Sequence, residues 1–122
     1  MLETIEVQRL LDIACLGFQR GKGKLARDIV EGLDTILTDD LSLEICRAMG
    51  FYTVDRFEEA REVLDSALET FPDNSMVWVH LALVDILEIK NEDAKAKIDR
   101  VMEKGDDEAA VALAKTFLDE LV

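Results

Sequence analysis

Residues 75–101 read SMVWVHLALVDILEIKNEDAKAKIDRV, and this stretch places small residues at Ala82 and Ala94. Alanine also stands 34 and 68 positions before each of them. The two columns are Ala14, Ala48 and Ala82, and Ala26, Ala60 and Ala94. A fixed period of this length is typical of proteins built from stacked structural repeats. The sequence therefore predicts three repeats, over residues 7–40, 41–74 and 75–108.

Larger apolar residues follow the same period. One such column holds Val30, Leu64 and Ile98, and a second holds Leu33, Ala67 and Val101. With one proline and six glycines in 122 residues, local propensity favours helix almost throughout. Two antiparallel helices approach closely only where the facing residues are small, which explains the alanine columns. We expect an all-α fold in which each repeat is a helical hairpin.

Apolar spacing and capping signals predict the helix boundaries. The capping signals are Asp55 with Glu58, the turn at 72–75, and the turn at 105–107. The expected helices span residues 3–19, 24–37, 41–53, 57–70, 75–89, 92–103 and 107–120. The turns between them are short, which predicts a single domain over residues 1–122.

The last expected helix differs from the repeats. Residues 107–121 read DEAAVALAKTFLDEL, with apolar residues at three- and four-residue spacing. A hairpin leaves one face bare, so a stack of repeats needs an atypical element over its last face. We expect residues 107–121 to form a capping helix, either closing the stack or folding back into its inner groove.

Several residues match a known repeat signature. Taking residues 7, 41 and 75 as the repeat starts, they are Trp78, Leu81, Gly21, Phe57 and Pro72, at repeat positions four, seven, fifteen, seventeen and thirty-two. With the alanines at positions eight and twenty, the chain resembles the tetratricopeptide repeat family. The resemblance implies an α-α superhelix of stacked helical hairpins and a protein-binding function.

The resemblance also implies which residues face an inner groove, because the first helix of each hairpin lines it in that family. The implied partner-binding residues are Leu11, Cys15, Phe18, Ile45, Met49, Tyr52, Met76, Val79, Leu83 and Ile86. An apolar groove with adaptable methionines suits the apolar face of an amphipathic helix. The same spacing is also that of ordinary core residues. A third interpretation is an interface for self-association into a homo-oligomer.

A narrower resemblance is to the bacterial type III secretion chaperones that hold needle subunits. It is carried by IACLG at 13–17, ARDIV at 26–30 and WVHLAL at 78–83. It implies a chaperone without enzymatic activity that keeps a polymerising subunit monomeric by holding its amphipathic C-terminal helix, often with a second small co-chaperone. The alternative is a generic adaptor or scaffold of the same repeat family.

The sequence offers little for catalysis or metal binding. His80 is the only histidine, and Cys15 and Cys46 stand 31 residues apart without metal-ligand spacing. We expect no catalytic residues, no metal site and no cofactor. The loop RGKGK at 20–24 lacks the spacing of a phosphate-binding loop, which favours a plain turn with solvated lysines.

The net charge and the distribution of apolar residues restrict the classes of partner that the chain can bind. The net charge of −13, from 27 acidic and 14 basic residues, disfavours binding to nucleic acid. No apolar run approaches the ~20 residues of a membrane span. The start, MLETIEVQRL, does not read as a secretion signal. These features favour a cytoplasmic protein with reduced thiols and no membrane insertion.

Overall fold

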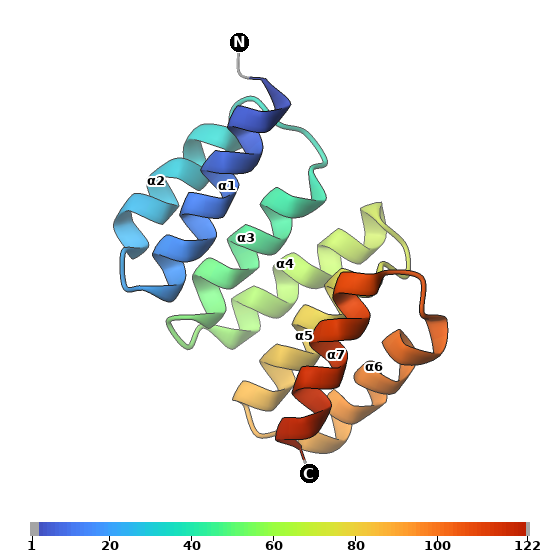
Figure 1. The fold of residues 1–122 in the computed structure, drawn as a ribbon. Helices are drawn as coiled ribbons and strands as arrows, with labels where there is room; N and C mark the ends of the chain where they lie inside the picture. Colours follow the sequence, from blue (N-terminus) through green and yellow to red (C-terminus); the bar gives the residue numbers. More distant parts are fainter. Residues whose placement is uncertain (1–2, 122) are drawn as a thin grey trace. The chain divides into compact units, whose positions relative to one another are not determined.

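The computed structural model describes residues 3–121, and within that range it contains seven helices and no strand. This confirms the predicted all-α fold. The helices are α1 (Thr4–Gln19), α2 (Gly23–Asp34), α3 (Leu41–Tyr52), α4 (Phe57–Thr70), α5 (Ser75–Leu87), α6 (Asn91–Lys104) and α7 (Glu108–Glu120) (Figure 1). The predicted boundaries differ from these by at most three residues. The largest difference is at α2, which ends at Asp34 in a turn where the Thr35 hydroxyl donates to the Gly32 carbonyl.

The turn inside each hairpin repeats the 34-residue period in its backbone conformation. Gly21, Asp55 and Ile89 all adopt left-handed φ values, of 76°, 63° and 60°. The N–H of the next residue then bonds to a carbonyl five residues back, which satisfies a free carbonyl at the helix end. These bonds are Lys22 N to Gly17 O at 2.7 Å, Arg56 N to Phe51 O at 3.0 Å, and Lys90 N to Asp85 O at 2.8 Å.

The observed helix caps agree with the predicted ones at two places and differ from the prediction at one. The Asn74 side chain accepts from Val77 N, and the Asp107 side chain accepts from Ala110 N, as the turns at 72–75 and 105–107 predicted. The predicted cap at Asp55 is wrong. Asp55 is needed in the left-handed turn that ends α3, so α4 begins two residues later, at Phe57.

Every alanine of the two columns is buried with no exposed surface. The first column lies on α1, α3 and α5, and the second on α2, α4 and α6. At the first hairpin the approach is so close that a Cβ on Gly17 would lie 3.3 Å from Cβ of Ala26. The small residues therefore stand at the helix contacts, as predicted.

The chain divides into two compact units, Met1–Val63 and Leu64–Val122, with α4 running through the point of division. In the first unit α1 and α2 form a hairpin, and α3 packs on both of them. In the second unit α5 and α6 form a hairpin, and α7 packs on both (Figure 1). Thus α7 packs on the α5–α6 hairpin as α3 packs on the α1–α2 hairpin, in the place where the first helix of a following repeat would lie. This is the capping role expected of residues 107–121.

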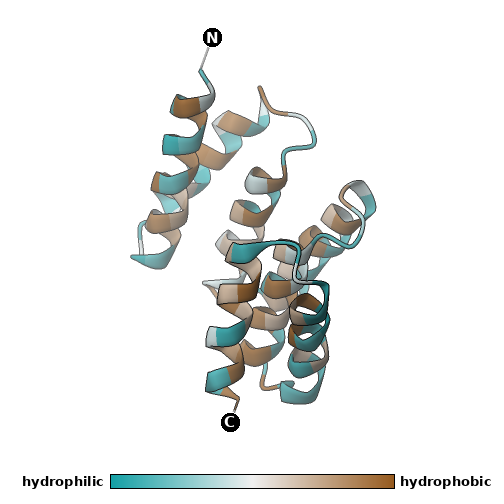
Figure 2. Ribbon diagram, turned by 45° about the vertical axis from the view of Figure 1, so that its right-hand side comes forward, coloured by the Kyte–Doolittle hydropathy of each residue, from teal (hydrophilic) through white to brown (hydrophobic). Residues whose placement is uncertain are grey.

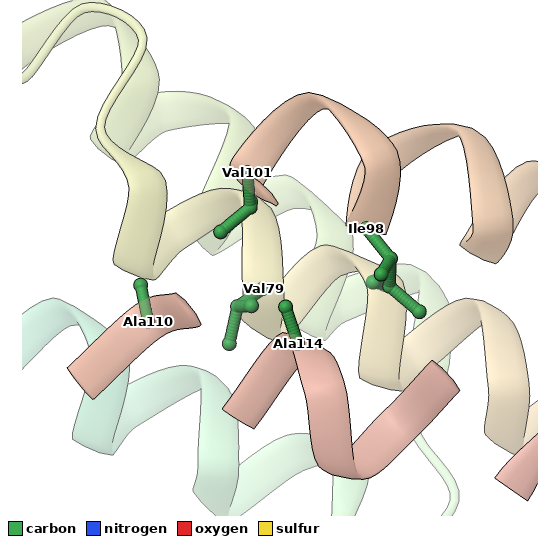
Figure 3. Close-up of a cluster of buried hydrophobic side chains, with 6 residues drawn as sticks. Val79, Ile98, Val101, Ala110 and Ala114 are labelled. Carbon is green, nitrogen blue, oxygen red and sulfur yellow. The ribbon is translucent and has the colours of Figure 1, made fainter. Parts of the chain in front are cut away.

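The core of the second unit is built from small and branched residues of three helices. Val79 and Ala82 of α5 meet Ile98 and Val101 of α6. Ala110 and Ala114 of α7 close the cluster (Figure 3). Figure 2 shows that hydrophobic and hydrophilic residues share the helices, as expected where only one face of a helix packs. None of the helices in residues 3–121 has both the length and the apolarity needed to cross a bilayer.

Candidate functional site

The ten residues predicted to line a partner-binding groove divide into two groups by exposure. Five are buried: Leu11, Phe18, Met49, Tyr52 and Val79, with exposed fractions between 0% and 8%. The other five are half-buried: Cys15, Ile45, Met76, Leu83 and Ile86. Only the second group has appreciable surface to offer a partner. The buried group packs inside its own unit.

Three contacts hold α1 against α3 in the first unit. The Cys15 and Cys46 sulfurs lie 3.4 Å apart, and the Gln19 amide nitrogen lies 4.0 Å from the Met49 sulfur. The third contact sets the Phe18 ring on Gly50. On each helix two of these positions lie three and four residues after the cysteine, so they form one seam along both helices. Phe18 and Met49 are therefore parts of this seam.

The thiol pair has unequal acidity. The hydrogen bond between the two thiols lowers the pKa of Cys15 and raises the pKa of Cys46, which burial raises further. Burial, followed by the neighbouring Cys15 and Cys46, also raises the pKa of Tyr52, so this phenol stays neutral. Cys15 is the more acidic and the less buried thiol of the pair. It is therefore the more reactive one.

In the second unit α7 covers part of the predicted groove residues. Val79 is fully buried beside Ala110 and Ala114 of α7 (Figure 3). Met76 and Ile86 pack against the same cluster but stay half-buried. We call the half-buried set Met76, Leu83 and Ile86 the α5 face, and Cys15 with Ile45 the α1–α3 face.

Sequence reasoning missed one exposed apolar residue next to the α5 face. Ile89 follows the end of α5, is 81% exposed, and carries a left-handed φ of 60° that branched residues rarely adopt. A signal was present in the sequence, because the first repeat has Gly21 at the corresponding position. Leu87, two residues earlier, is 45% exposed. The end of α5 is thus richer in exposed apolar surface than expected.

His80 sits in the packed interior of the second unit. Its side chain is 9% exposed, and burial lowers its pKa to about 4, so it is neutral at pH 7. Within residues 3–121, no three side chains of the metal-binding types come together. His80 is therefore a buried, neutral residue of the core.

Comparison with known proteins gives one match. The family model described as tetratricopeptide repeat matches residues 41–86, which span α3, α4 and most of α5. No curated protein and no solved structure matches the chain. The matched segment falls on the second predicted repeat and the first helix of the third. It supports the tetratricopeptide repeat family, whose members serve protein–protein interaction, and it indicates no catalytic family.

Proposed function

We propose that this chain is a protein-binding repeat chaperone that holds an amphipathic helix of a partner against half-buried apolar side chains on the first helices of its hairpins. The observation that carries the proposal is the α5 face, where Met76, Leu83 and Ile86 keep apolar surface in contact with water. Side chains at helical spacing with partly exposed apolar surface fit the apolar stripe of a second helix. The repeat-family match supports the same class of function.

The α1–α3 face supports the proposal in the first unit. Cys15 is part of the seam between the two helices, and Ile45 directly precedes Cys46 of that seam; both residues are half-buried. Five of the predicted contacts are buried and therefore act indirectly, by holding in place the helices that carry the two faces. They are Leu11, Phe18, Met49, Tyr52 and Val79. Exposed apolar surface on a highly charged chain is costly to keep unless a partner covers it.

A model amphipathic helix tests this function. The probe is a fluorescein-labelled 18-residue peptide with a leucine stripe and an uncharged glutamine and serine polar face, followed by fluorescence anisotropy. Leu83→Asp places a charge in the α5 face and is expected to weaken binding by about tenfold or more. Leu25→Asp is the matched control, because Leu25 is 54% exposed on α2 and outside both faces. Circular dichroism of both variants checks that helicity is retained.

The result that contradicts the proposal is equal binding by the Leu83→Asp and Leu25→Asp variants. If Leu83→Asp loses its helicity, Ile45→Asp on the α1–α3 face takes its place, because the same comparison then rests on another half-buried residue. Absence of any binding by the unmodified chain also rejects the proposal. Sedimentation of the chain alone over a range of concentrations tests the self-association alternative.

The narrower proposal is that the partner is a needle subunit of a type III secretion system, held together with a second small co-chaperone in the cytoplasm. It is supported by the stretches at 13–17, 26–30 and 78–83. Covering an amphipathic helix removes the surface through which a fibre grows. Adding the chain to a purified needle subunit is expected to halt fibre growth measured by light scattering. Unchanged growth would leave the adaptor or scaffold alternative in place.

A further inference from the structure

A pocket in the first unit lies outside the two apolar faces. It has a volume of about 210 Å³ and opens among α1, α2, α3 and the turn that follows α3. Of the residues predicted for partner binding, its lining includes only Phe18. The apolar part of the lining is formed by Phe18, Val30, Phe51 and Val54.

The size of the pocket selects the kind of group it can take. Drug-sized ligands and cofactors occupy sites of roughly 300–1,000 Å³. A volume of about 210 Å³ falls below that range and suits one bulky side chain. Val30 and Phe18 at the floor are 5% and 7% exposed, whereas Val54 is 53% exposed, so the pocket has a buried floor and an accessible wall.

Three arginines border this apolar space, with Glu31 as the one carboxylate in the lining. They are Arg27 on α2, Arg47 on α3 and Arg56 in the turn before α4. The chain as a whole has 27 acidic and 14 basic residues, so a lining with three arginines and one glutamate reverses its charge balance. The residues that line the pocket are therefore more basic than the chain as a whole.

The arginines are held in place by neighbours outside the pocket. An Arg47 guanidinium nitrogen lies 2.6 Å from Asp34, and its Nε lies 3.5 Å from Glu44. Arg56 pairs with Glu59 and stacks over the Phe51 ring, 5.1 Å from its centroid. A guanidinium has five N–H donors, so each pair leaves donors unused. Among the described residues Arg27 has no ion-pair partner.

We infer that this pocket binds an acidic peptide segment that inserts one bulky apolar side chain and sets its carboxylates against Arg27, Arg47 and Arg56. The apolar floor recognises the inserted side chain, and the unused guanidinium donors bind flanking carboxylates. Arg27, unpaired within residues 3–121, and the unused donors of Arg47 and Arg56 favour an acidic segment at this pocket, whereas the net charge of −13 disfavours one elsewhere on the chain. This inference does not rest on the proposed function, because the pocket and the α5 face are lined by different residues.

The probe is the blocked peptide DDFDD, titrated into the full chain labelled with ¹⁵N. Amide chemical shifts are expected to move at Gly50, Phe51 and Val54, which line the pocket. The peptides DDADD and NNFNN are the matched probes, lacking the apolar side chain and the charges respectively. Both are expected to bind at least about tenfold more weakly than DDFDD. Added salt is expected to weaken DDFDD binding because the carboxylate contacts are partly exposed.

Charge reversal at Arg27 provides the matched variants. Arg27→Glu is expected to lower the affinity for DDFDD by about tenfold or more, since Arg27 is exposed and lacks an ion-pair partner in the described chain. Arg9→Glu makes the same change in charge at an exposed site on α1 outside the pocket, and less than about twofold loss is expected. Circular dichroism confirms the fold of both.

Three results would overturn the inference. They are absence of DDFDD binding at about 1 mM, equal binding of DDADD or NNFNN, and shifts that cluster away from the pocket. Leu83→Asp is expected to leave DDFDD binding unchanged, so failure here and failure of the proposed function remain distinguishable. If the chain self-associates and Arg27→Glu abolishes that association, the occupant is a second copy of the chain instead of a separate partner.

Discussion

The ring of Phe18 lies directly on the backbone of Gly50. A Cβ placed on Gly50 would come within 2.7 Å of Phe18 Cζ, closer than real carbon atoms approach. This contact sits in the seam between α1 and α3 and at the edge of the pocket in the first unit. The absence of a side chain at Gly50 is thus what lets the first hairpin receive the next helix.

Gly50→Ala is expected to destabilise the protein by about 1–3 kcal/mol, because Phe18 must leave its position. Gly32→Ala is the matched control, since a Cβ there meets nothing within 4 Å. It is expected to stabilise by roughly 0.5–1 kcal/mol through the better helix propensity of alanine. Urea unfolding followed by circular dichroism measures both. Equal stabilisation by the two variants would show that Phe18 has room to move.

Ile89→Gly is expected to raise the free energy of unfolding by about 1 kcal/mol. A branched residue is strained at a φ of 60°, and an 81% exposed side chain loses little burial when removed. Gly21→Ala, the reverse change in the first hairpin at a φ of 76°, is expected to destabilise. Thermal unfolding of the two variants checks the signs. A less stable Ile89→Gly would mean that this side chain packs usefully.

The stability of the fold is expected to depend on pH through His80. Its pKa is about 4 in the folded state and near 6.5 when unfolded, so the unfolded chain binds more protons between these values. The contribution of neutral His80 to the free energy of unfolding is complete above pH 6.5 and is lost as pH falls toward 4. Between pH 7 and pH 5 the loss is about 2 kcal/mol.

His80→Gln removes this titration and provides the comparison. Urea unfolding of both proteins across that pH interval is expected to give a steeper fall in stability for the unmodified chain. Other groups contribute equally to both curves, so they cancel in the difference. Parallel curves would place the folded pKa of His80 near its ordinary value.

Cys15 and Cys46 are expected to form a disulfide when the folded protein meets a thiol oxidant such as diamide. Their sulfurs are 3.4 Å apart, and a bond length of ~2.05 Å requires only a small approach. Each thiol gives up one proton and one electron, and diamide is reduced by taking up the two protons and two electrons. The protein mass therefore falls by two hydrogen atoms. Mass spectrometry of the intact chain measures this. Cys15→Ser is the control, and two thiols that still react separately with an alkylating reagent would contradict the expectation.

The sequence by itself determined the helices and their contacts. The alanine columns, the apolar columns and the turns at 72–75 and 105–107 depend on local propensity and on a period that any hairpin of this kind must show. They placed all seven helices to within three residues. The capping assignment at Asp55 failed because a carboxylate suits either a helix start or a left-handed turn, and the need to end α3 took precedence.

Only the tertiary structure decided which apolar side chains stay accessible. Val79 and Leu83 both lie on α5, yet Val79 is covered by Ala110 and Ala114 of α7 while Leu83 remains half-buried. The period of a helix tells which residues share a face, but the neighbour that covers the face comes from a distant segment. For the same reason the pairing of Cys15 with Cys46, and the gathering of Arg27, Arg47 and Arg56 at one pocket, appeared only when the helices were packed.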